Sequence, residues 1–184
     1  MPFLLEECDI TDAVADTRAA LLVPCGFCPA VSFAVQTGRP YLEPIRHGFR
    51  TPVYEEHVRK LKTELEARGL KVRRFDWWSP HQLVVCMWTD ARRTALARQA
   101  AEHDVVVVIG CDAARKMIED CLAGAGVRVV QAMRMEGLMD VVPVLEFPCR
   151  LSLKMGALTR VLEPAAAAPV AAPESRIGAQ SVQT

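Results

Sequence analysis

The sequence lacks an excess of charge of either sign. Its 22 lysine and arginine residues balance its 22 aspartate and glutamate residues, so the formal net charge is zero. Proteins that bind nucleic acids or anionic membranes through their overall electrostatic field carry a basic excess. We therefore expect no nucleic-acid partner for this chain.

Long apolar runs are also missing. The longest strongly apolar run, Val105 to Ile109, is far shorter than the roughly 20 residues that cross a bilayer as a helix. The first residues, MPFLLEECDITDAVAD, contain a short apolar patch followed by acids, whereas a secretory signal peptide starts with basic residues and continues with a longer apolar run. We expect no membrane insertion and a cytoplasmic location.

The common nucleotide-binding loops are absent as well. No G-x-G-x-x-G or P-loop motif follows an expected strand, and the glycine pair of Gly124–Gly126 precedes a strand instead. Basic residues do recur in the first turns of two expected helices, where they could hold an anion. These residues are Arg92, Arg93, Arg115 and Lys116, and simple solvation of helix surfaces explains them equally well.

The length and composition favour one folded domain. A chain of 184 residues is long enough to bury a core without disulfide bonds. After Leu162 the sequence becomes rich in alanine and proline and contains no aromatic residue, which is typical of a segment that cannot form a packed core. We predict a single α/β domain over residues 1–160 and a disordered tail over residues 161–184.

Short apolar runs alternate with helical patterns along the domain. Because strands separated by helices of this length pair in parallel, we predict a three-layer α/β sandwich with a mostly parallel sheet of four or five strands, Rossmann-like or flavodoxin-like. Residues 135–153 are apolar but interrupted by glycine and proline, so we expect an edge strand or extended segments there. The expected strands are Ala19–Val23, Lys71–Trp77, Leu83–Trp88, Val105–Ile109 and Val127–Met133.

Four of the seven cysteines follow, or lie late in, the expected strands. Cys25 and Cys28 form a CGFC motif directly after the first strand, Cys111 directly follows the strand VVVVI, and Cys86 lies late in LVVCMW. The carboxyl ends of parallel strands share one edge of a sheet, where functional groups gather. We therefore expect these four thiols to lie together.

Four neighbouring thiols are the ligands that zinc and a [4Fe–4S] cluster prefer. The leading prediction is therefore a small cysteine-ligated metal or iron–sulfur protein with Cys25, Cys28, Cys86 and Cys111 as ligands. It would be an electron-transfer or accessory component that works with a protein partner in a larger redox complex. Cys149, in FPCR, is a possible additional ligand.

The CGFC motif is similar to the active-site motif of thioredoxin-like proteins, and the segment VPVL at 142–145 resembles the proline segment that faces the redox pair in that family. This resemblance implies a thiol–disulfide oxidoreductase. Cys25 would be the nucleophile, with its pKa lowered by a helix N-terminus, and Cys28 would be the resolving thiol.

The order of Cys25, Cys28, Cys86 and the Gly110-Cys111 pair also resembles the iron–sulfur small subunits of nickel–iron hydrogenases and related quinone reductases. Those proteins place cysteines after the first strand of a flavodoxin-like sheet and have a later Gly-Cys-Pro. Here Asp112 stands in the place of that proline. The resemblance implies a cluster bound at the edge of the sheet.

Two further interpretations remain open. Cys111 precedes an expected helix that Asp112 would cap, so its thiolate could act as a lone nucleophile with His47 or His81 as the base. Alternatively, the chain is a non-catalytic α/β interaction domain in which the cysteines are ordinary core residues. If the protein is an enzyme, the sequence favours an oxidoreductase.

Overall fold

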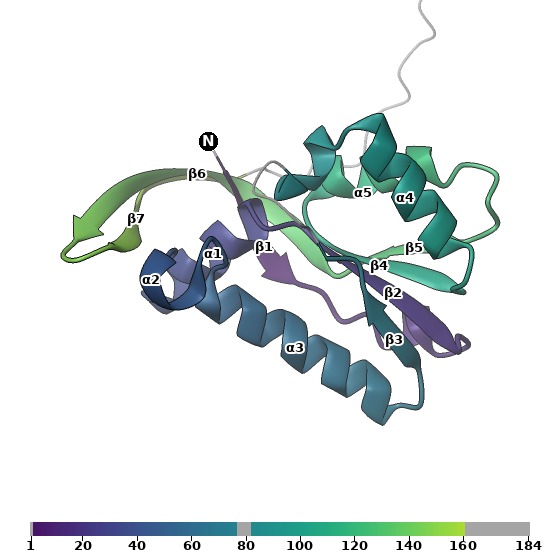
Figure 1. Ribbon diagram of the computed structural model, residues 1–184. Coiled ribbons are helices and arrows are strands. Elements are labelled where there is room, and N and C mark those ends of the chain that lie inside the picture. The colour runs from purple at the N-terminus through teal and green to yellow at the C-terminus, as the bar shows by residue number, and fades with distance from the viewer. Residues whose placement is uncertain (1, 77–81, 161–184) are drawn as a thin grey trace, which may run out of the picture.

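The structure is a computed structural model that describes residues 2–76 and 82–160. It contains two β-sheets and the helices that pack on them (Figure 1). The tail expected over residues 161–184 lies outside the described residues.

The larger sheet has four parallel strands in the order β3-β2-β4-β5. This confirms the predicted α/β class and the parallel pairing. The strands are β2 (Ala19–Pro24), β3 (Lys71–Arg74), β4 (Val105–Ile109) and β5 (Arg128–Gln131).

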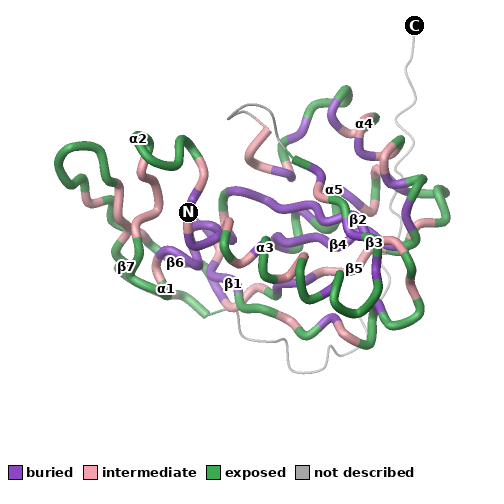
Figure 2. The backbone as a smooth tube through the Cα atoms, turned by 60° about the horizontal axis from the view of Figure 1, so that its bottom comes forward, coloured by how far each residue is buried: buried purple, intermediate pink, exposed green. Residues whose placement is uncertain are grey.

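Helices cover both faces of the parallel sheet. Figure 1 shows α1 and α3 on one face and α4 and α5 on the other. The central strands β2 and β4 are buried almost throughout, as Figure 2 shows, which explains why both read as continuous apolar runs. The helices are α1 (Cys28–Thr37), α3 (Pro52–Ala67), α4 (Asp90–Ala100) and α5 (Asp112–Cys121).

Helix α3 illustrates how the sequence pattern produces this packing. Its buried residues Tyr54, Val58 and Leu65 recur at helical spacing, so one face packs against the sheet while its charged residues face solvent. The helix ends near Gly69, which has a φ of 90° and adopts the left-handed conformation that favours glycine.

A second, antiparallel sheet has the strand order β1-β6-β7. It contains β1 (Phe3–Glu7), β6 (Met133–Glu146) and β7 (Arg150–Arg160). Strands β6 and β7 form a hairpin that extends beyond the helices (Figure 1), beside the short helix α2 (Pro44–His47). Near its turn, Leu145 is 84% exposed and Phe147 is 98% exposed.

One expected strand is wrong. Leu83–Trp88 does not form a strand; it contains a short 3-10 helix, η3 (Val85–Met87). Val85 is fully buried whereas Met87 is exposed, and the main-chain oxygen of Leu83 accepts a hydrogen bond from the Gly26 amide at 2.9 Å. A short apolar run does not specify a strand by periodicity alone. Here the segment lies over the carboxyl ends of the strands and does not pair with any of them.

The ends of the other expected strands also differ. The strand expected over Val127–Met133 is divided between β5 and the start of β6. The strand expected over Lys71–Trp77 ends at Arg74, and Trp77 lies outside the described residues. Residues 135–153 are extended, as expected, but they belong to a hairpin in the second sheet. The sequence analysis missed β1, and also a 3-10 turn, η1 (Asp12–Val14).

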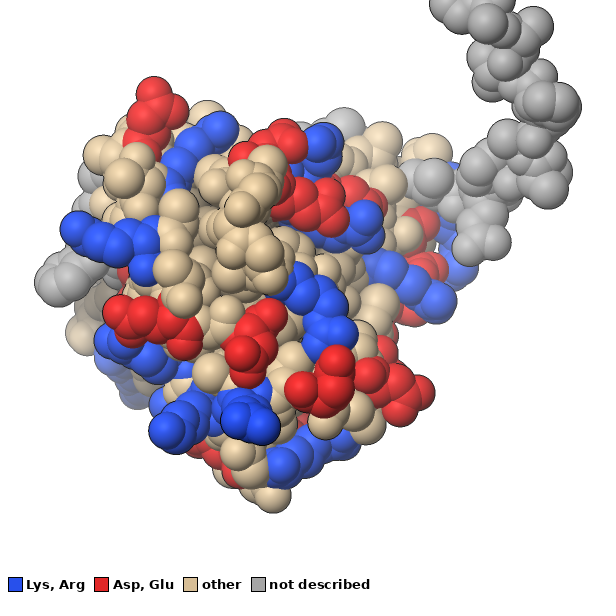
Figure 3. Space-filling model, turned by 90° about the vertical axis from the view of Figure 1, so that its right-hand side faces the viewer, with Lys and Arg blue, Asp and Glu red and all other residues tan. Residues whose placement is uncertain are grey.

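Charges of both signs are interspersed on the face shown in Figure 3, where no broad patch of one sign is seen. Many are paired, for example Arg128 with Asp16 at 2.6 Å. Within the described residues, no helix is long and apolar enough to cross a membrane.

Ser32 links strand β1 of the antiparallel sheet to helix α1, which begins at Cys28. Its fully buried hydroxyl accepts a hydrogen bond from the Leu5 amide of β1 at 3.0 Å. The hydroxyl lies 3.1 Å from the Phe3 carbonyl and 2.9 Å from that of Cys28, either of which can accept its proton. This contact therefore fixes α1 against β1.

Replacing Ser32 with alanine should lower the free energy of unfolding by about 1–3 kcal/mol, because the buried Leu5 amide would lose its acceptor. Urea denaturation would measure the change. The matched control is Thr63→Ala, which removes an exposed hydroxyl bonded to the Arg59 carbonyl and should change stability by less than about 0.5 kcal/mol. Equal effects of the two variants would contradict the assigned role of Ser32.

Candidate functional site

The CGFC motif forms the turn between β2 and α1. The Cys25 amide donates a hydrogen bond to the Ile109 carbonyl at the end of β4, at 2.9 Å. Gly26 packs against Leu83 so closely that an added Cβ would lie 1.9 Å from the Leu83 Cδ1 atom. The turn is therefore held between the end of β4 and the segment that carries Cys86.

Cys111 begins α5 from the end of β4. It occupies the N-cap position, so the expectation that Asp112 caps this helix is wrong; Asp112 is the first helical residue. An added Cβ on Gly110 would lie 3.4 Å from the Cys25 Cβ atom and 2.9 Å from that of Ala114. The missing side chain at Gly110 thus allows the CGFC turn to approach the start of α5.

The structure brings the four predicted cysteines together. The thiol groups of Cys28 and Cys111 are joined by a hydrogen bond. Cys25 interacts electrostatically with both Cys111 and Cys86, and Cys86 also interacts with Cys111. Cysteines from three separate segments of the chain therefore lie near one another at the carboxyl ends of the strands.

The pKa values of these thiols move in opposite directions. The hydrogen bond from Cys28 and the backbone amides of Ala114 and Ala113 lower the pKa of Cys111 to about 6, as expected for a thiolate at a helix N-terminus. The hydrogen bond to Cys111, together with burial, raises the pKa of Cys28. Burial raises the pKa of Cys86 and raises that of Cys25 to about 11.

These shifts overturn one expectation from the thioredoxin-like motif. Cys25 does not have a lowered pKa, because it is buried directly after β2 and α1 begins only at Cys28. The acidic thiol is Cys111. Pro143, expected to face the redox pair, lies in β6 and pairs with Leu153 in the other sheet.

The remaining cysteines lie elsewhere. The Cys121 Sγ atom contacts the Met117 Sδ atom at 3.4 Å on α5. Cys149 is exposed at the turn of the β6–β7 hairpin, so the structure does not bring this possible extra ligand to the site. Cys8 follows β1, where its amide bonds the Ala132 carbonyl.

The described histidines have partners away from Cys111. The His57 ring stacks on Phe33 at 4.3 Å, and the His103 Nδ1 atom lies 2.9 Å from the Gln99 carbonyl. His47 lies 3.9 Å from Glu43. The structure therefore does not place His47 as a base for Cys111, and His81 lies outside the described residues.

The sequence analysis missed two tyrosines that border the cysteines. Tyr41 interacts electrostatically with Cys25 and Cys28, and burial raises its pKa to about 12. Tyr54 is fully buried, interacts with Cys25, and donates a hydrogen bond from its hydroxyl to the Ile109 carbonyl at 3.3 Å. The only available signal was their rarity, since the chain has just two tyrosines.

The side chains as they stand do not form a site for a single metal ion. Across residues 2–76 and 82–160, no three histidine, cysteine, aspartate or glutamate groups have an arrangement that could hold one ion. The four cysteines are neighbours, but no three of their side chains are arranged around one point.

Comparisons with protein-family models, with curated proteins and with solved structures found no match for this chain.

The ionised thiol can be tested by following thiolate ultraviolet absorption against pH in the reduced, metal-free protein. One thiol should ionise with a midpoint near pH 6, so the thiolate is present above this pH and protonated below it. Cys111→Ser should abolish this step. Cys28→Ala should move it to higher pH, because the thiolate loses a hydrogen-bond donor.

The control for this titration is Cys121→Ser, which removes a thiol outside the site and should retain the low-pH step. Survival of that step in Cys111→Ser would show that the acidic thiol is another cysteine.

Proposed function

We propose that the protein is a small cysteine-ligated iron–sulfur protein that serves as an electron-transfer or accessory component of a larger redox enzyme. The observation that carries this proposal is the convergence of Cys25, Cys28, Cys86 and Cys111 from three separate segments. A pair of thiols suffices for disulfide exchange, whereas four are the usual ligand number for a cluster.

The arrangement favours a [4Fe–4S] cluster over zinc. A zinc ion requires its four ligands to surround one point, and the described groups do not provide this. In a cluster each cysteine binds a different iron atom, so the sulfur atoms need only border a common space. A bound cluster would supply one-electron transfer at this site.

The protein's own residues would control the environment of such a centre. Cys25 and Cys111 are 2% and 3% exposed, and the buried ring of Tyr54 lies beside Cys25. Burial and hydrogen bonds near the sulfur atoms are the main means by which a protein tunes a cluster potential. The free thiols of all seven cysteines support the proposed cytoplasmic location, because that compartment is reducing.

The physiological partner would be a redox protein that exchanges electrons with this centre. The exposed apolar residues Leu145 and Phe147 at the end of the hairpin are suited to contact such a protein. If so, the double variant Leu145→Ser/Phe147→Ser should retain the cluster but lose electron exchange with a purified partner. Unchanged exchange would remove the hairpin from this role.

Protein purified without oxygen and reconstituted with iron and sulfide should bind iron and inorganic sulfide in equal amounts and show a broad visible absorption that bleaches on reduction. Cys86→Ser and Cys111→Ser should each lose most of this absorption. The matched controls Cys121→Ser and Cys149→Ser remove thiols outside the site and should retain it.

Three results would contradict the iron–sulfur proposal. Stoichiometric zinc without colour would keep the four-cysteine site but remove electron transfer. A colourless, metal-free protein would favour thiol chemistry. Retained cluster in Cys86→Ser and Cys111→Ser would place any cluster elsewhere.

The hydrogen bond between Cys28 and Cys111 favours a second candidate, thiol–disulfide exchange. The Cys111 thiolate would attack a substrate disulfide, break its S–S bond and release one substrate thiolate. Cys28 would then give up its proton to that thiolate and attack the Cys111 sulfur, releasing the second substrate thiolate. The products are a Cys28–Cys111 disulfide and a reduced substrate with one thiol and one thiolate, and the thiolate takes a proton from water.

Equilibration in a glutathione redox buffer, followed by peptide mapping, would test this second candidate. It predicts a Cys28–Cys111 disulfide, and Cys25→Ser should still form it. A Cys25–Cys28 disulfide would instead support the pairing expected from the CGFC motif. If the protein forms no disulfide and binds no metal, two interpretations remain: a lone Cys111 nucleophile and a non-catalytic α/β interaction domain.

A further inference from the structure

A cavity lies between the edge strand β3 and helix α4. It has a volume of about 340 Å³ and its lining includes none of the cysteines. Its polar and aromatic lining residues are Arg73, Phe75, Arg92, Arg98, Gln99 and Glu102. The volume falls in the range of small-molecule sites, roughly 300–1,000 Å³.

Arg92 is the unusual member of this lining. It is only 8% exposed, and its guanidinium carbon lies 3.8 Å from the centre of the Phe75 ring and 5.1 Å from that of Trp88. These aromatic contacts fix the plane of the guanidinium, and therefore the direction of its N–H groups.

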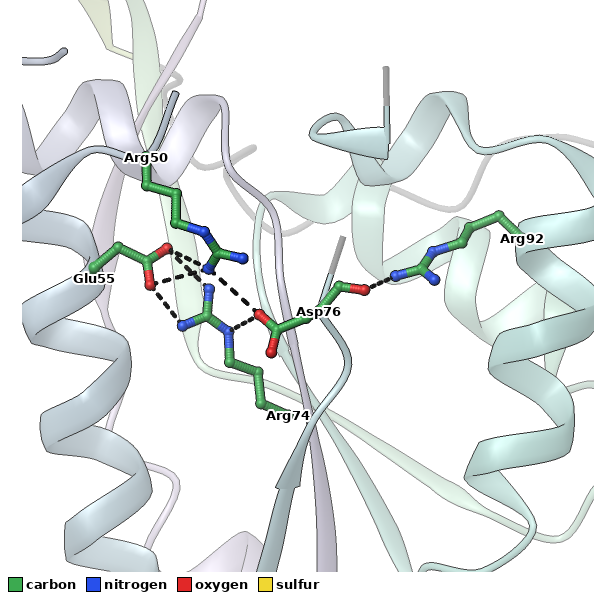
Figure 4. A network of polar contacts seen from close by, with 5 residues as sticks. All are labelled: Arg50, Glu55, Arg74, Asp76 and Arg92. Carbon is green, nitrogen blue, oxygen red and sulfur yellow. Dashed lines mark hydrogen bonds and ion pairs between the residues drawn. The ribbon is translucent and has the colours of Figure 1, made fainter. Parts of the chain in front are cut away.

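The hydrogen-bonding capacity of Arg92 is mostly unused. Its Nη2 atom donates to the Asp76 carbonyl, and among the described residues its buried Nε atom has no partner. Figure 4 shows that the Asp76 carboxylate instead faces Arg74 and Arg50, at 2.7 and 3.4 Å. Burying a cation that has no hydrogen-bonded carboxylate costs free energy. A bound anion would reduce this cost at Arg92.

The other charges of the cavity reinforce this conclusion. Arg73 is paired with Glu102 at 3.1 Å, which neutralises the one acidic group among the described residues of the lining. Arg98 is exposed, and the structure gives it no ion pair within the described residues. Two arginines of the cavity therefore carry positive charge that no lining carboxylate neutralises.

We propose that this cavity binds a small phosphate-bearing molecule, with Arg92 as the buried, oriented donor and Arg98 as the exposed one. A planar guanidinium group can donate two parallel hydrogen bonds to two oxygen atoms of a phosphate. Phe75 adds an apolar wall for the rest of the molecule. This site is independent of the cysteine centre, because no residue is shared between them.

The test is calorimetric titration of the full-length reduced protein with inorganic phosphate and with pyrophosphate, at ionic strength held constant with chloride. At least one of the two should bind saturably with one site per chain. Arg98→Gln should weaken that binding about tenfold or more, as expected for loss of a charged hydrogen-bond partner. Because Arg98 is exposed, this variant should fold normally.

The matched control is Arg115→Gln, an exposed helical arginine paired with Glu119 at 2.8 Å, which should bind the anion like the original protein. Arg92→Lys keeps the charge but not the planar fork; where circular dichroism shows it folded, it should also weaken binding. Absence of saturable binding of both anions, an unaffected Arg98→Gln, or equal weakening by Arg115→Gln would overturn the proposal.

Discussion

The pairing of β2 with β4 is the constraint on which the cysteine site depends. These two buried strands end side by side, and the hydrogen bond from the Cys25 amide to the Ile109 carbonyl extends their pairing by one residue. Gly110 then leaves room for the CGFC turn beside α5. A side chain there would bring its Cβ to 2.9 Å from that of Ala114 and would displace the start of α5, which carries Cys111.

The sequence predicted the parallel sheet because its two central strands are short, apolar runs and because helical patterns separate the expected strands. It also predicted the shared position of four thiols, since VVVVI leads directly into Cys111 and AALLV into Cys25. In both cases the topology of parallel strands converts positions far apart in the sequence into neighbours. No contact between side chains had to be known.

The predictions that were wrong concern features that depend on tertiary contacts. LVVCMW contains apolar residues that suit a strand. It is buried because it lies over the carboxyl ends of the strands beside Gly26, not because it pairs with a strand. The acidity of the thiols likewise depends on which sulfur receives the helix amides. Because α5 starts at Cys111, its first backbone amides donate hydrogen bonds to the Cys111 sulfur. Cys25, the first cysteine of the CGFC motif, remains buried and neutral.

If the proposed cluster binds here, the opposite pKa shifts mean that only one of the four thiols ionises readily beforehand. Cys111 ionises readily, but Cys25, Cys28 and Cys86 hold their protons more strongly than a free thiol. Four thiolates in this buried space would repel one another, and only the positive charge of bound iron or another cation can compensate them. Loading the site would therefore release protons from three cysteines, and the thiolate of Cys111 would provide the first ligand.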